Sequence, residues 1–154
     1  LTLHASVIQY EGNGYFFLGK SGTGKSTHSR QWLSAFPKAE LMNDDNPILR
    51  LIDNKPIIFG SPWSGKTPCY KNACAPVRGI VQLKQAPENS FERLRLPAAY
   101  AYMLSSSSGL KIIPSVMDAL YATIAAVIQT IPVILLSCLP NEDAARMSYQ
   151  AFME

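Results

Sequence analysis

The chain has 154 residues, of which 47% are apolar and 16% charged, and a chain of this length folds as one domain, so we expect a single domain over residues 1–154. The 14 Lys and Arg residues and 11 Asp and Glu residues leave a net charge of only +3 without a basic run, which argues against a nucleic-acid-binding protein. The odd number of cysteines, without a CxxC pair or nearby histidines, argues against a disulfide framework and a zinc site, so we expect a cytoplasmic protein.

The N-terminal third of the chain predicts a hairpin that leads into a loop and a helix. Residues 3–10 show the apolar and polar alternation of a strand and are rich in β-forming residues. Residues 15–18 are apolar and aromatic, and the EGNG segment between the two supplies turn residues. The glycine-rich segment GKSGTGKST follows, and residues 25–36 then show helical periodicity up to Pro37.

The middle of the chain predicts further antiparallel strands and one long loop. Residues 39–42 form a short apolar strand, and residues 48–52 and 57–59 predict two strands joined by the turn residues DNKP. Residues 60–76 are rich in Gly, Pro, Ser and Lys, and so long a connection without structure is more often functional than not. An apolar strand at residues 77–83 comes next.

The C-terminal half predicts helices around one buried strand. Residues 92–103 favour a helix, and the serine-rich segment 105–109 favours a mobile connector. Residues 119–139 carry no charge and are long enough to span a bilayer, but Pro132 interrupts them, so we expect a core helix and a core strand rather than a membrane span. A last helix ends near Phe152. Together these elements predict an α/β fold with a mostly antiparallel or mixed sheet flanked by helices.

Residues 19–26 match the phosphate-binding pattern GxxxxGK[ST] in full, between a predicted strand and a predicted helix. Glycines let the backbone wrap an anion, exposed N–H groups and the helix dipole attract phosphate, Lys25 adds positive charge, and the Ser26 hydroxyl is a ligand for magnesium. A glycine-rich turn without a ligand is the alternative, which the flanking strand and helix disfavour. We expect the nucleotide to be bound by Gly19, Ser21, Gly22, Thr23, Gly24, Lys25, Ser26 and Thr27.

The same pattern occurs a second time, in residues 60–67. Pro68 follows at once and no helical period precedes Pro76, so the helix that would hold phosphate is missing and we interpret this match as a coincidence. Lys66, with Lys71 nearby, suggests a clamp for substrate or phosphate, and a solvated loop is an equally weighted alternative.

Asp44 and Asp45 stand at the end of an apolar strand, where a metal-binding acid stands beside a phosphate loop. Adjacent residues of a strand point to opposite sides, so one carboxylate is expected to hold magnesium and the other, Asp44, to accept a proton from an attacking hydroxyl. An Asx turn formed by NDDN is the alternative. The spacing of His4, one strand before the phosphate loop, leaves a structural and a catalytic role open.

Four segments together resemble the superfamily of HPr kinase/phosphorylase and ATP-dependent phosphoenolpyruvate carboxykinase. They are LHAS at 3–6, FFLGKSGTGKST at 16–27, MNDD at 42–45 and VRG at 77–79, in the order and spacing of the family. The hairpin before the phosphate loop also suits this group and is unlike the parallel unit of other P-loop NTPases. The resemblance implies a core like that of phosphoenolpyruvate carboxykinase.

The resemblance also implies roles for individual residues. Lys25 and the loop amides would hold the phosphates of ATP, and Ser26 and Asp45 would bind Mg²⁺, with Mn²⁺ as an alternative. Asp44 would act as base toward a serine hydroxyl. His4 matches a family histidine near the γ-phosphate that helps to bind a second metal in the carboxykinases.

One further match, the VRG segment, comes with a departure from the family pattern. Arg78 matches an arginine whose positive charge would stabilise the transferring phosphoryl group. The family signature has an acidic residue two positions before this arginine, and this chain has Pro76 at that position. The departure puts phosphorylase activity, and HPr itself as the substrate, in doubt.

The sequence therefore predicts an enzyme that transfers the γ-phosphoryl group of Mg-ATP to a hydroxyl, expected to be a protein or peptide serine. The alternatives are a small-molecule kinase and an ATP-binding maturation or regulatory module without catalysis. A carboxykinase is disfavoured because the chain is too short to supply an oxaloacetate site. Whether a homo-oligomer forms is left open. The expected catalytic residues are Asp44, His4, Arg78 and Lys66.

Overall fold

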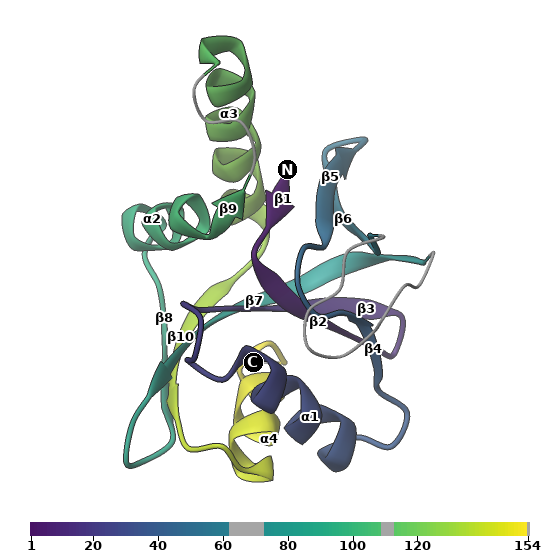
Figure 1. The fold of residues 1–154 in the computed structure, drawn as a ribbon, viewed down its shortest axis with the longest axis vertical. Helices are drawn as coiled ribbons and strands as arrows, with labels where there is room; N and C mark the ends of the chain where they lie inside the picture. Colours follow the sequence, from purple (N-terminus) through teal and green to yellow (C-terminus); the bar gives the residue numbers. More distant parts are fainter. Residues whose placement is uncertain (62–72, 109–112, 154) are drawn as a thin grey trace.

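A mixed β-sheet with helices on both faces forms the body of the molecule (Figure 1). The structure, a computed structural model, describes residues 1–61, 73–108 and 113–153. In these residues the helices are α1 (Lys25–Ala35), α2 (Leu96–Ser106), α3 (Pro114–Thr130) and α4 (Glu142–Ala151). The strands are β1 (Thr2–Leu3), β2 (Ala5–Tyr10), β3 (Asn13–Leu18), β4 (Glu40–Asn43), β5 (Ile48–Ile52), β6 (Lys55–Phe59), β7 (Cys74–Gln85), β8 (Ser90–Arg93), β9 (Ser107–Ser108) and β10 (Val133–Cys138).

Strand direction at the centre of the sheet decides where the functional residues meet. β7 pairs in parallel with β3 and with β10, and the other pairings among the described strands are antiparallel. β4 also runs in the direction of β3, because each of them is antiparallel to β2. The C-terminal ends of β3, β4, β7 and β10 therefore reach one edge of the sheet, which is where α/β proteins place their ligands. This arrangement confirms the predicted α/β fold with a mixed sheet.

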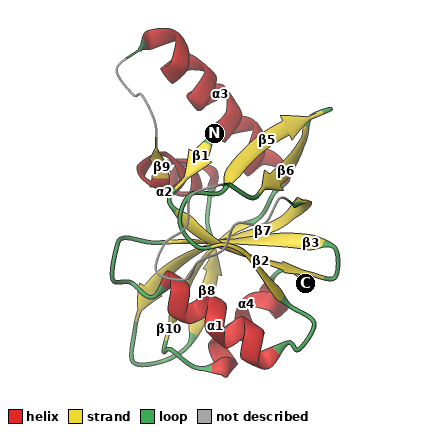
Figure 2. Ribbon diagram, turned by 45° about the vertical axis from the view of Figure 1, so that its right-hand side comes forward, coloured by secondary structure: helices red, strands yellow, loops and turns green. Residues whose placement is uncertain are grey.

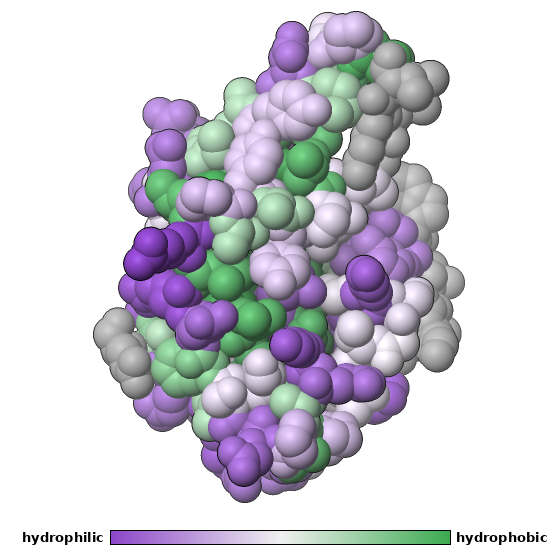
Figure 3. Space-filling model, turned by 90° about the vertical axis from the view of Figure 1, so that its left-hand side faces the viewer, coloured by the Kyte–Doolittle hydropathy of each residue, from purple (hydrophilic) through white to green (hydrophobic). Residues whose placement is uncertain are grey.

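The two faces of the sheet bury separate hydrophobic clusters (Figure 2). On one face α2 and α3 pack against the sheet through Met103, Ile124 and Val127, among others. On the other face α1 and α4 pack through Trp32 and Phe152. Figure 3 shows that further apolar side chains gather at the surface on the side of the molecule that carries α2 and β8. No helix in the described part of the chain is long and apolar enough to cross a membrane.

The predicted helix over residues 92–103 begins too early and was partly wrong. Ser90–Arg93 form β8, which pairs antiparallel with β10, and α2 starts only at Leu96. Pro97 lies in the first turn of α2, where a missing N–H costs nothing, so it favours this start. The predicted serine-rich connector was also wrong where it is described, because α2 runs to Ser106 and β9 (Ser107–Ser108) pairs with β1.

Hydrogen bonds among buried polar side chains join α1 to α4. The Trp32 indole N–H donates to Ser148 Oγ at 2.9 Å, and His28 Nε2 lies 3.1 Å from the same oxygen. His28 is buried, and loss of solvation lowers its pKa to about 3. The imidazole is therefore neutral in the folded protein at neutral pH.

We predict that acid destabilises the fold through His28. Between pH 6.5 and about 3 the unfolded chain binds a proton at this residue that the folded protein excludes, so the free energy of unfolding falls as the pH is lowered through this range. The expected contribution is about 1.4 kcal/mol per pH unit. Urea unfolding between pH 7.5 and 4.5 measures it, with His28→Gln as the non-titrating reference. An equal pH dependence in both proteins would contradict the prediction.

Candidate functional site

The phosphate-binding pattern forms a tight loop between β3 and α1. Gly22 and Gly24 have φ angles of 86° and 99°, in the left-handed region that glycine adopts without a steric penalty. Gly24 is also the N-cap residue of α1 and has no side chain to bond the first helical amides. The first N–H groups of a helix have no partner within the helix. Those of α1 are therefore available to bind an anion in the loop.

Lys25 and Thr23 hold the loop in this shape. The Lys25 ammonium donates to the carbonyls of Gly19 and Lys20, at 2.8 and 3.3 Å, and the Thr23 hydroxyl donates to Lys20 O at 2.6 Å. Partial burial lowers the pKa of Lys25, and the charges of Asp44 and Asp45 oppose that shift. The positive charge is thus fixed within the loop and close to two carboxylates.

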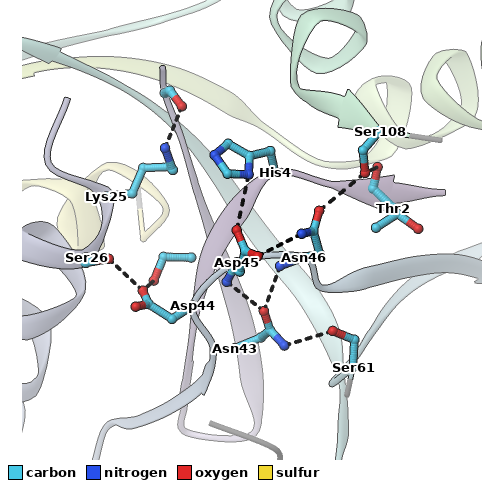
Figure 4. Close-up of polar contacts among 12 residues, drawn as sticks. Thr2, His4, Lys25, Ser26, Asn43, Asp44, Asp45, Asn46, Ser61 and Ser108 are labelled. Carbon is cyan, nitrogen blue, oxygen red and sulfur yellow. Dashed lines mark hydrogen bonds and ion pairs between the residues drawn. The ribbon is translucent and has the colours of Figure 1, made fainter. Parts of the chain in front are cut away.

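Asp44 lies beside the phosphate loop and contacts α1. The Ser26 hydroxyl donates to Asp44 Oδ1 at 2.8 Å (Figure 4). The Ser6 hydroxyl donates to the same oxygen at 3.1 Å. The Asp44 side chain is buried. The expected neighbour of Ser26 was Asp45, so the structure pairs Ser26 with the other aspartate of the two.

Asp45 points to the other side of the strand end, towards His4. Its Oδ1 lies 3.4 Å from His4 Nδ1, and its Oδ2 accepts a hydrogen bond from Asn46 Nδ2 at 3.0 Å (Figure 4). The Asx turn considered as an alternative is present, because Asn43 Oδ1 accepts from the backbone N–H groups of Asp45 and Asn46. The turn is compatible with a functional role, since within it Asp44 contacts Ser26 and Asp45 contacts His4.

These groups line a cavity of about 430 Å³ at the N-terminus of α1. Its walls come from the phosphate loop, from both aspartates and from His4. Arg30 also lines it, although the sequence analysis did not identify this residue. Its position one helical turn after Ser26 is the signal that would have found it, because residues four apart share a helix face. Every wall residue in the described part of the chain is hydrophilic or glycine, a composition that suits an anionic ligand.

The structure does not bring Arg78 to this cavity. Leu18, which precedes the phosphate loop, pairs with Gln82. Arg78 lies several residues earlier on β7, at the register shift where the partner of Gly14 is Val77 and the partner of Tyr15 is Gly79. The Arg78 guanidinium donates to Phe152 O at 3.0 Å, after the end of α4. Lys66, the other expected catalytic cation, and most of the second pattern match lie outside the described residues.

The glycine of the VRG segment also serves the packing of this region. A Cβ atom on Gly79 would lie 2.5 Å from the ring of Phe152, which is buried against β7. Arg78 and Gly79 together therefore fix the position of the C-terminal turn of α4.

Comparison with known proteins supports the architecture. No family model matches the chain, and no curated protein matches it in sequence. Among solved structures, the HPr(Ser) kinase/phosphatase from Coxiella burnetii is similar, with a TM-score of 0.55 over 100% of this chain and 99% of that one. The two chains share one fold. Their sequences are only 16% identical, so the match to the Coxiella kinase/phosphatase confirms the predicted fold and leaves the site residues to be tested.

We predict that Gly79→Ala destabilises the protein by about 1–3 kcal/mol, because the added methyl group clashes with the Phe152 ring. Urea unfolding of Gly79→Ala, Phe152→Ala and the double variant measures the coupling. In the Phe152→Ala background, Gly79→Ala should lower the free energy of unfolding by much less than it does in the parent protein. Additive losses would contradict the proposed contact.

Proposed function

We propose that the chain binds Mg-ATP at residues 19–27 and transfers its γ-phosphoryl group to the hydroxyl of a protein or peptide serine. The proposal depends on one observation: the phosphate loop and the carboxylates of Asp44 and Asp45 line one cavity, and Asp44 accepts a hydrogen bond from Ser26. A glycine-rich turn without a ligand does not need this arrangement. The fold shared with an HPr(Ser) kinase/phosphatase supports phosphoryl transfer and a serine acceptor. Pro76 argues against HPr itself as that acceptor.

The residues beside the loop fit a Mg²⁺ ion that shares its ligands with phosphate. Ser26 and Asp44 offer hard oxygen ligands 2.8 Å apart, and Mg²⁺ commonly takes one or two protein oxygens together with substrate phosphates. Mn²⁺ would accept the same ligands. No group of three or more His, Cys, Asp or Glu side chains that could hold a metal by itself occurs in the described residues. When bound, the metal would neutralise charge on the phosphates.

The geometry favours an exchange of the two aspartate roles expected from the family resemblance. Asp44 is buried beside Ser26, which suits a metal ligand. Asp45 lines the cavity next to His4, which suits a base that accepts the proton of an attacking hydroxyl. His4, whose Nδ1 lies 3.4 Å from Asp45 Oδ1, would hold the Asp45 carboxylate in place.

Two cations of the cavity would stabilise the transferring group. Lys25 is fixed in the loop, and Arg30 lines the same cavity one helical turn further along α1. Arg30 therefore takes the place proposed for Arg78, whose guanidinium contacts the end of α4. Lys66 remains a proposed clamp for the acceptor.

We predict that Asp44→Asn and Asp45→Asn have different kinetic effects. Asp45→Asn should lower the rate of phosphoryl transfer to serine peptides by about 10²–10⁴-fold with little change in Mg-ATP affinity, because it removes only the proton acceptor. Asp44→Asn should weaken Mg-ATP binding. Transfer from γ-labelled ATP and calorimetric titration measure the two quantities.

The matched control is Asp53→Asn. Asp53 lies in the exposed turn between β5 and β6 with a φ of 52°, which asparagine also adopts readily, so this variant should behave as the parent protein. Full transfer activity in Asp45→Asn would remove Asp45 from the role of base.

A further inference from the structure

A run of serines, residues 105–108, ends beside the candidate site. The backbone N–H of His4 donates to Ser106 O at 2.7 Å. The two residues that follow Ser106 form β9, which pairs with β1, the strand that directly precedes His4. The end of the serine run is therefore held against the segment that brings His4 to the wall of the cavity.

Ser108 is connected to the proposed base through a single side chain. Its hydroxyl donates to Asn46 Oδ1 at 3.3 Å, and Asn46 Nδ2 donates to Asp45 Oδ2 at 3.0 Å (Figure 4). Ser108 is exposed. An accessible hydroxyl thus lies one side chain away from the carboxylate that would accept its proton.

The hydrogen bonds that Ser108 makes are long for a hydroxyl. Its Oγ lies 3.3 Å from Thr2 O as well as from Asn46 Oδ1, whereas hydrogen bonds of this kind are usually about 2.7–2.8 Å. A serine hydroxyl has one proton, so it donates fully to only one of these two acceptors. The hydroxyl therefore loses little when it leaves them for Asp45.

Two other serines of the run are turned away from the site. The Ser105 hydroxyl donates to Tyr102 O at 3.0 Å, and the Ser107 hydroxyl donates to Leu104 O at 2.7 Å. Both acceptors are carbonyls of α2. Of these three hydroxyls, that of Ser108 is the one that contacts the segment of the two aspartates.

We propose that Ser108 is an acceptor within the chain itself, phosphorylated by the site of the same molecule. The Ser108 hydroxyl oxygen attacks the γ-phosphorus of ATP, and Asp45 accepts the hydroxyl proton. The bond from that phosphorus to the oxygen of the β-phosphate breaks, so the products are phosphoserine and ADP. The inference rests on the proposed function, because it names one serine on which the same site acts.

Mapping of phosphate on the full chain tests this assignment. After incubation with Mg-ATP, tandem mass spectrometry should find one phosphoryl group, at Ser108. Ser108→Ala should remove it, and Asp45→Asn should lower its rate of formation by about 10²–10⁴-fold. The matched control is Ser105→Ala, which removes an exposed serine of the same run and should leave the rate unchanged.

Two further measurements make the result specific. Calorimetric titration should show that Ser108→Ala and Ser105→Ala bind Mg-ATP as tightly as the parent protein, so that loss of the phosphate does not reflect loss of the nucleotide. The fraction of chains phosphorylated per unit time should not depend on protein concentration, because transfer within one molecule is first order. A rate that rises in proportion to concentration would overturn transfer within the molecule.

The outcomes separate this inference from the proposed function. Transfer to serine peptides without phosphate on Ser108, or phosphate on another serine of the chain instead, would overturn the assignment of Ser108 while the proposed function stands. Absence of transfer to peptides and to Ser108 alike would overturn the proposed function and this inference with it.

Discussion

The parallel pairing of β7 with β3 and β10 is the constraint on which the rest of the structure depends. Because these strands and β4 run in one direction, the segments that follow them meet at one edge of the sheet. The phosphate loop follows β3, and the two aspartates follow β4. Residues at and after the ends of β7 and β10 line a further cavity beside the phosphate loop. The hydrogen bond from Ala5 N to Asp45 O, at 3.0 Å, holds the end of β4 against the start of β2 and so brings His4 to the same edge.

Charge separates the two sides of the phosphate loop. On one side Lys25, Arg30 and the two aspartates line a polar cavity. On the other side a cavity of about 540 Å³ at the ends of β7 and β10 has a mainly apolar described wall, in which neutral His28 and the uncharged Thr23, Thr27 and Gln85 are the polar residues. The partial burial that lowers the pKa of Lys25 also strengthens its attraction for a phosphate, since a buried charge is less screened by water. An anionic ligand is therefore attracted to the side that carries Lys25 and Arg30, which is the basis for the proposed phosphate site.

Local sequence patterns predicted the parts of the site that depend on local geometry. The hairpin, the phosphate loop and α1 follow from turn residues, from glycines that adopt positive φ angles and from helical periodicity. The pairing of Ser26 with Asp44 could not be predicted, because a turn at Asn43 decides which carboxylate faces α1. The position of Arg78 depends on the strand register between β3 and β7, which a motif does not encode. β8 was missed because its exposed residues show no alternation and its partner β10 is distant in sequence.

The central claim is that the backbone amides of the phosphate loop bind a triphosphate. The most direct measurement is the ¹H–¹⁵N spectrum of the labelled protein during titration with Mg-ATP, with magnesium alone as the reference. The amide resonances of Gly22, Gly24, Lys25 and Ser26 should shift with ATP concentration and saturate together. Resonances that stay in place at millimolar ATP, or shifts confined to residues away from this loop, would contradict it.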